Sequence, residues 1–200
     1  DSIFLKNKKI ALGPTIAFAI LTTVSTFQGQ NVNAENFMLG FIIIAFYLIT
    51  STKTFTPLRL IASGILIGIA ALFKIPSIFD LGAIIFIWLL SVKNKKTFTE
   101  FFKNSFILGV SALLPIIASI IWYYFRGALN EYWIAAFLQN FGYVSSWREG
   151  TQQVSGLASK LPLLGRAGIV LSGLLILYFF KKKLTPGFIF AVAWFLFSLF

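Results

Sequence analysis

The residues best placed to do chemistry are a few charged and amide side chains that border long apolar runs. Glu35 is the only charged residue between Lys9 and Lys53, and an apolar run over residues 37–50 follows it directly. Asn33 can cap a helix that begins here, which would put Glu35 in the first turn, where unpaired backbone N–H groups favour a charged carboxylate. Such a carboxylate can orient a substrate or a divalent metal, or it can simply favour a helix start at the water interface. The residues alone leave both interpretations open.

Lys74 is the second candidate, because it ends a glycine-rich apolar run just before Pro76. An ammonium group in this place can bind the phosphate of a lipid-linked substrate as a point charge. The alternatives are an ion pair with Asp80 or extension of the side chain to the lipid headgroups. We take both Lys74 and Asp80 as candidate substrate-binding residues.

A longer polar segment at residues 126–166 carries further candidates. Its large apolar residues recur at helical spacing at Trp133, Phe137, Phe141 and Val144. This spacing predicts a helix that lies in the membrane interface, although the aromatic residues can equally anchor a re-entrant loop. Tyr143 and Arg148 stand among stacking and hydrogen-bonding groups that suit a sugar or a phosphate, so both are candidate substrate-binding residues.

The composition indicates the class of protein that must position these groups. Apolar residues make up 58% of the 200, charged residues 12%, and the mean hydropathy is +0.88. In an ordinary soluble domain, about half of the residues are apolar and about a quarter are charged. We therefore predict a multi-pass membrane protein. The absence of cysteine and histidine excludes disulfides, thiolate or histidine metal sites, and a histidine-based triad within these residues.

Seven apolar runs predict seven helices, at residues 10–27, 37–50, 58–73, 77–92, 106–125, 167–180 and 188–200. A membrane span needs about 20 residues, so several runs must include polar flanks, and the last must continue past Phe200. We predict an all-α, polytopic transmembrane bundle that forms one domain over residues 1–200 and belongs to a longer protein. Gly64 and Gly68 form a GxxxG pattern in the third run, which favours close helix packing.

The net charge of +11 does not indicate nucleic acid as a partner, because the basic residues gather in short clusters between the apolar runs. Alternate connections hold Lys6, Lys8, Lys9, Lys53, Arg59, Lys93, Lys95, Lys96, Lys103, Lys181, Lys182 and Lys183. The positive-inside rule predicts that these connections face the cytoplasm. Glu35, Lys74, Asp80 and residues 126–166 then share the outer face of the membrane.

Two short motifs stand one hairpin apart, NAENF at residues 33–37 and GILIGIAALFKIP at residues 64–76. Their order resembles that of the GT-C class of membrane glycosyltransferases, in particular bacterial relatives of the dolichyl-phosphate-mannose protein mannosyltransferases and of the lipid A aminoarabinose transferases. In that class, an acid at the outer start of a helix often precedes a glycine-rich helix that ends in lysine. The resemblance covers roughly residues 6–147.

The resemblance implies an inverting hexosyl- or pentosyltransferase in the bacterial cytoplasmic membrane, with its site on the outer face. Its donor would be a polyprenyl-phosphate sugar, and its acceptor an envelope lipid, glycan or protein. The principal catalytic acid of such enzymes lies in a first outer loop that would precede residue 10, outside these residues. Glu35 is then expected as a second catalytic acid, with Asn33, Lys74, Asp80, Tyr143 and Arg148 around the substrate. A divalent metal is compatible with this chemistry, but no cofactor is firmly implied.

The alternative class is a polytopic transporter or flippase for a lipid-linked or small polar substrate. Such a protein should carry charges near the middle of the membrane and internal repeats. The apolar runs contain no such charge, and the chain shows no internal repeat. An assembly subunit is a third possibility, and in that case Glu35 and Lys74 would be replaceable.

Overall fold

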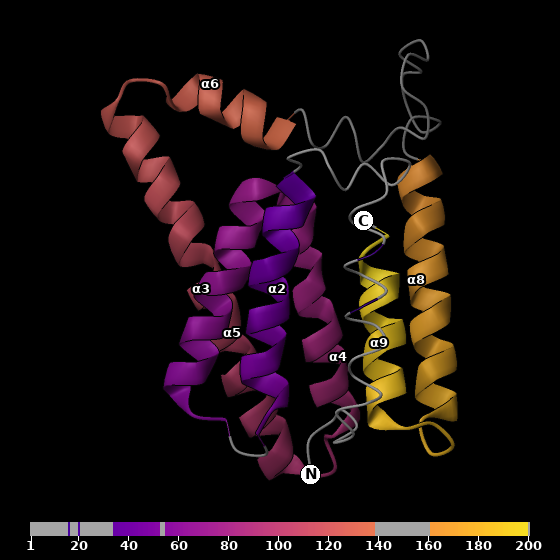
Figure 1. Cartoon of the computed structure of the whole chain (residues 1–200). Helices are drawn as coiled ribbons and strands as arrows, with labels where there is room; N and C mark the ends of the chain where they lie inside the picture. Colours follow the sequence, from indigo (N-terminus) through magenta and orange to yellow (C-terminus); the bar gives the residue numbers. More distant parts are fainter. Residues whose placement is uncertain (1–15, 17–19, 21–33, 53–54, 139–160, 200) are drawn as a thin grey trace.

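A computed structural model describes residues 16, 20, 34–52, 55–138 and 161–199, and these residues form helices and turns with no β-strand. The α-helices are α2 (Ala34–Thr50), α3 (Pro57–Phe73), α4 (Leu81–Leu90), α5 (Lys95–Phe125), α6 (Leu129–Trp133), α8 (Leu161–Phe180) and α9 (Pro186–Phe197). A 3-10 helix, η2 (Ile75–Asp80), precedes α4, and a π-helix, η3 (Ile134–Leu138), continues α6 (Figure 1). The all-α prediction is confirmed for these residues. Six of the seven apolar runs lie in these helices, whereas the run at residues 10–27 lies outside them apart from Ile16 and Ile20.

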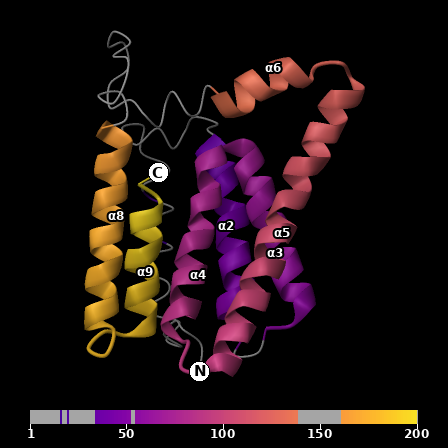
Figure 2. The same cartoon turned by 180° about the vertical axis from the view of Figure 1, so that it is seen from behind.

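α2 and α3, α4 and α5, and α8 and α9 run antiparallel, whereas α3 and α5 run in the same direction (Figures 1 and 2). Charged residues of different kinds gather at the two ends of the bundle. Glu35 begins α2 and Lys74 follows α3 at the end that α6 covers, which we call the α6 end. The residues between α4 and α5 and the triple Lys181, Lys182 and Lys183 after α8 lie at the other end, which we call the lysine end. This arrangement agrees with the grouping of connections expected from the charge pattern.

Two glycines of α3 allow this helix to pack closely against α5. A Cβ atom added at Gly64 would lie 2.6 Å from the backbone oxygen of Leu108, and one added at Gly68 would collide with the backbone oxygen of Ala112. Glycine allows the two helix backbones to approach this closely. The packing role predicted for the GxxxG pattern is therefore confirmed.

Side chains of α2, α3, α4, α5, α8 and α9 form the buried core. α9 contributes through its contacts with α2 and α4. Phe46 of α2 meets the ring of Trp194 edge-on, with 5.0 Å between ring centroids. Gly82 of α4 lies against the ring of Phe197, where an added Cβ would collide with it. A buried hydrogen bond from Ser63 Oγ to the backbone oxygen of Ala45, at 3.2 Å, joins α3 to α2.

Two helices in the described part of the chain, α5 with 31 residues and α8 with 20, are long and apolar enough to cross a membrane. The other apolar helices of the bundle are shorter, with α2 and α3 at 17 residues and α9 at 12. Large apolar side chains on the two long helices are exposed, among them Leu113, Ile117, Ile121, Leu171, Leu175 and Phe179. These exposed faces suit contact with lipid better than contact with water.

Several helix boundaries differ from those predicted, among them those of α5, α8 and α9. α5 begins at Lys95 rather than at residue 106, because Asn94 and Thr97 form a capping box in which each side chain accepts from the backbone N–H of the other, at 3.0 Å. α8 begins at Leu161 and includes Arg166, so residues 161–166, which were predicted to belong to the loop, are helical. α9 ends at Phe197, and the backbone N–H of Leu199 then bonds three residues back to the oxygen of Leu196, which is the pattern of a turn.

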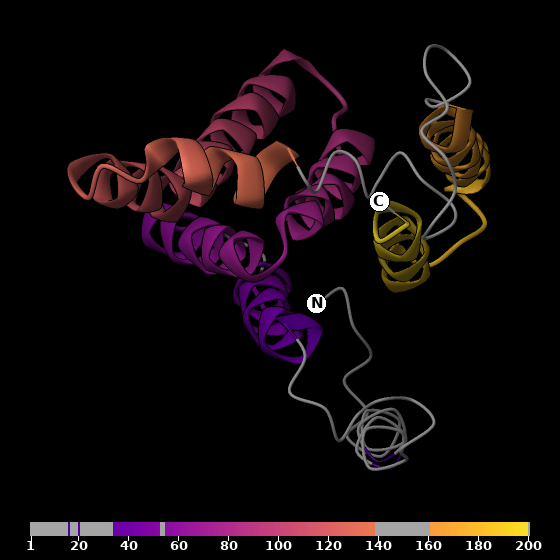
Figure 3. The same ribbon diagram turned by 90° about the horizontal axis from the view of Figure 1, so that it is seen from above.

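α6 follows a tight turn at Gly127, whose φ of +70° is a conformation that favours glycine. α6 and η3 then lie across the end of the bundle (Figure 3). Trp133 stacks on Phe137 at a centroid distance of 4.5 Å, as their helical spacing predicts. A helix in the first part of the segment at residues 126–166 is thus confirmed, whereas Phe141 and Val144 lie outside the described residues and the interfacial position stays a prediction.

Candidate functional site

The centre of the candidate site is an ion pair between Glu35 and Lys74. Lys74 Nζ lies 2.6 Å from Glu35 Oε1, and the two side chains are 33% and 52% exposed respectively. Glu35 lies in the first turn of α2, and Lys74 is the extended residue between α3 and η2. Because α2 and α3 are antiparallel neighbours, the start of one lies beside the end of the other. The ion pair thus stands at the α6 end, open to its surroundings.

Aromatic stacking below the ion pair holds these two helix ends together. The ring of Phe73 stacks on that of Phe37 at 5.7 Å and on that of Phe41 at 5.8 Å, measured between centroids. Phe73 directly precedes Lys74, and Phe37 lies two residues after Glu35. The charged pair therefore rests on an apolar support that fixes the separation of the two backbones.

Hydrogen bonds from Lys74 and from the backbone N–H of Glu35 itself lower the pKa of the Glu35 carboxyl group. The carboxylate is therefore charged at neutral pH, and its lowered basicity makes it a weak proton acceptor. It is better suited to orient a hydroxyl group or to attract a cation. Within the described parts of the chain, no group of three carboxylate, histidine or cysteine side chains is present, so a divalent cation at Glu35 would need ligands from elsewhere.

Asp80 lies inside the bundle, where it is 5% exposed. Its Oδ1 accepts a hydrogen bond from the indole N–H of Trp194 at 3.0 Å. The alternative in which Lys74 pairs with Asp80 is therefore wrong, since Lys74 pairs with Glu35 and Asp80 is bound to α9. The geometry gives Asp80 a structural contact and does not bring it to the ion pair.

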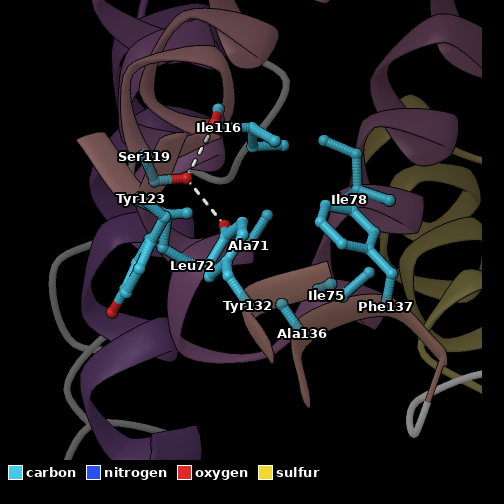
Figure 4. A pocket seen from close by; sticks show the side chains of 10 residues that line it. All are labelled: Ala71, Leu72, Ile75, Ile78, Ile116, Ser119, Tyr123, Tyr132, Ala136 and Phe137. Atoms are coloured by element: carbon cyan, nitrogen blue, oxygen red, sulfur yellow. Dashed lines mark hydrogen bonds between the residues drawn. The ribbon is translucent and has the colours of Figure 1, made fainter. Parts of the chain in front are cut away.

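An apolar cavity of about 400 Å³ opens beneath α6 (Figure 4). It lies on the side of α3 that faces α5, whereas the ion pair lies on the side that faces α2. Its walls come from the end of α3, η2, α5, α6 and η3, with the residues Ala71, Leu72, Ile75, Ile78, Ile116, Ser119, Tyr123, Tyr132, Ala136 and Phe137. Leu72 and Ile75 line the cavity, while Lys74 between them pairs with Glu35. At the end of α3, Lys74 therefore faces α2, whereas Leu72 and Ile75 face the cavity that α5 also lines.

Two hydroxyl groups supply the polar contacts of this cavity. Ser119 Oγ donates to the backbone oxygen of Ile116 at 2.7 Å, so the 2.7 Å bond between Ser119 Oγ and the Tyr132 hydroxyl has Tyr132 as its donor. Tyr123 stacks on Tyr132 with 4.4 Å between ring centroids. The cavity therefore combines apolar walls with one oriented hydroxyl pair, a common composition for a small-molecule site.

The sequence predictions did not single out Ser119 or Tyr132. Ser119 stands within an apolar run, where a serine often bonds to its own helix. The sequence could not indicate the contact between Ser119 and Tyr132, because this contact depends on the position of α6 relative to α5. The other candidates Asn33, Tyr143 and Arg148 lie outside the described residues, so their predicted roles stay predictions.

Comparisons with protein-family models, with curated proteins and with solved structures found no match to this chain.

Proposed function

We propose that the protein is a membrane glycosyltransferase that moves a sugar from a polyprenyl-phosphate carrier to an envelope acceptor. The observation that carries this proposal is the position of the Glu35–Lys74 ion pair, which stands at the end of the bundle on the opposite side of α3 from an apolar, aromatic cavity. A polyprenyl-phosphate sugar needs both a cation for its phosphate and an apolar surface for its chain.

Lys74 would bind the donor phosphate, because its ammonium is partly exposed and fixed at the end of α3. A phosphate that takes over Lys74 frees the carboxylate of Glu35 to orient the acceptor hydroxyl or a divalent metal. In the reaction, the acceptor oxygen attacks the anomeric carbon and the bond from that carbon to the phosphate oxygen breaks. The phosphate leaves with the electron pair, while the acceptor proton passes to the principal catalytic acid, which the resemblance to the GT-C class places before residue 10.

The same proposal places the protein in the bacterial cytoplasmic membrane as a multi-pass protein with the α6 end outside. α5 and α8 have the length and composition of membrane spans. The shorter apolar helices complete the bundle, and the lysine end faces the cytoplasm in accordance with the positive-inside rule.

The test is sugar transfer from a polyprenyl-phosphate donor by the purified protein and its Glu35→Gln variant at matched amounts. Glu35→Gln keeps the size of the side chain but removes its charge, so turnover should fall about a hundredfold, or roughly 2.7 kcal/mol. Glu131→Gln in α6 is the matched control, because it removes an exposed acid from the same end without disturbing the pair. Activity of Glu35→Gln within about threefold of the unmodified protein would contradict the proposed role.

Movement of the lipid-linked donor between leaflets is measured in parallel, in vesicles that contain the protein. Movement of the donor without sugar transfer would contradict the enzyme and indicate the flippase alternative. Transfer without such movement would support the enzyme.

A further inference from the structure

A second cavity, of about 560 Å³, lies at the lysine end between the end of α4 and the turn from α8 to α9. It is lined by Ile87, Leu90, Ser91, Lys93, Lys181, Leu184, Pro186 and Ile189. Two of these residues are lysines and none is acidic, so the cavity joins a positive rim to an apolar floor. Figures 1 and 2 show the end of α4 beside the α8–α9 turn.

The two lysines come from distant connections that the fold brings together. Lys93 follows α4 and Lys181 follows α8, and the packing of α4 against α9 holds the two connections together. Lys181 is the half-buried member of its triple, whereas Lys182 and Lys183 are exposed. Its Nζ lies 4.2 Å from the centre of the Tyr178 ring, which restrains the side chain. These contacts distinguish Lys181 from a freely solvated charge.

The start of α9 also favours an anion. α9 begins at this cavity with Thr185 as its cap, and its positive dipole end adds to the two ammonium groups. The opposite effect of the α4 end is reduced, because Ser91 donates through its N–H to Trp88 O and through its Oγ to Ile87 O. The neighbouring cavity at the same end contains Glu100 beside Lys103, so its charges offset each other.

We propose that the cavity between α4 and the α8–α9 turn binds an anionic phospholipid, with its phosphate at Lys93 and Lys181. The acyl chains would lie along the apolar floor that Leu90, Leu184 and Ile189 form. A lipid suits the site better than a free phosphate, because half of the lining is aliphatic and because α8, a helix long enough to span a membrane, ends at this cavity. Basic pockets between membrane helices on the cytoplasmic side bind anionic headgroups in this way. The bound lipid bridges α4 to the α8–α9 hairpin, and this site is independent of the proposed sugar transfer.

The experiment compares retained lipid and thermal stability of the purified, delipidated protein on addition of phosphatidylglycerol, phosphatidylcholine or glycerol 3-phosphate. Phosphatidylglycerol should be retained in native mass spectra and should raise the unfolding temperature by several degrees, whereas the other two should not. Equal stabilisation by phosphatidylcholine, or by glycerol 3-phosphate, would overturn the anionic-lipid assignment.

Paired variants distinguish binding in this cavity from a general attraction between the lysine end and an anionic lipid. Lys93→Gln with Lys181→Gln should weaken phosphatidylglycerol binding about tenfold, and Lys181→Arg should preserve it. The matched control, Lys96→Gln with Lys182→Gln, removes the same charge from exposed positions at the same end of the bundle that do not line the cavity, and should bind normally. Equal weakening in both double variants would overturn the site. If the first double variant does not fold, the single Lys181→Gln variant set against Lys182→Gln decides by the same criterion.

Discussion

The indole N–H of Trp194 donates a hydrogen bond to the buried carboxylate of Asp80, at 3.0 Å and across 114 positions of the chain. Trp194 also meets the ring of Phe46 edge-on, so three helical segments meet at one side chain. This contact fixes α9 to the start of α4 and thereby forms the side of the bundle on which the lysine-end cavity opens.

Trp194→Phe should lower the free energy of unfolding, because it removes a hydrogen-bond donor from a buried carboxylate and keeps most of the ring packing. Loss of such a partner costs about 1–3 kcal/mol. Thermal unfolding in detergent measures the change, with Trp122→Phe on the exposed face of α5 as the control. Equal effects of the two substitutions would show that the bond to Asp80 adds no stability.

Gly68→Ala should push α3 away from α5, since the new methyl group would collide with the backbone oxygen of Ala112. Overpacking of this kind costs about 1–3 kcal/mol. Gly109→Ala is the matched control, because nothing lies within 4 Å of the added Cβ and alanine is the better helix former. We expect Gly109→Ala to be neutral or stabilising, and a destabilisation equal to that of Gly68→Ala would contradict the close contact.

Lys74→Ala should raise the apparent KM for the polyprenyl-phosphate donor about tenfold while changing stability by less than about 1 kcal/mol. An exposed ion pair contributes little to folding, whereas a phosphate contact contributes directly to donor binding. Lys74→Arg keeps the charge and should restore most of the affinity. Arg126→Gln, at the same end, serves as the control. A normal KM in Lys74→Ala would return Lys74 to a structural role in its pair with Glu35.

Single cysteines test the topology, because these 200 residues contain no cysteine of their own. A Glu131→Cys variant at the α6 end should react with an impermeant thiol reagent in intact cells, because this end is expected outside. A Lys95→Cys variant at the lysine end should react only after the membrane is permeabilised. Labelling of position 95 in intact cells would reverse the proposed orientation.

The order of the helices from residue 34 onwards could be predicted, because charged residues or proline border most of the apolar runs. The start of α5 was placed too late because the run KKTFTEFFKNS is polar, although the Asn94–Thr97 capping box marks the true beginning. The start of α8 was placed too late because Arg166 interrupts its apolar pattern. Both errors arise because apolar content alone does not show where a helix begins.

The candidate site could be predicted only in part, because contacts between helices depend on their packing. Glu35 and Lys74 were each singled out, but their ion pair spans 39 positions and requires the register of the α2–α3 hairpin. The partner of Asp80 lies much further along the chain, and no local pattern indicates it. The cavity beneath α6 combines side chains from separate helices, which no single segment of the sequence reveals.

The bond between Asp80 and Trp194 also has a consequence for synthesis. A ribosome adds about 5–20 residues per second, so Asp80 exists for roughly 6 to 23 seconds before Trp194 is made, given the 114 positions between them. During that interval the carboxylate must be hydrogen-bonded by water or by another donor. The side of the bundle where α9 meets α4 is therefore expected to close last, after α2 to α5 have already packed.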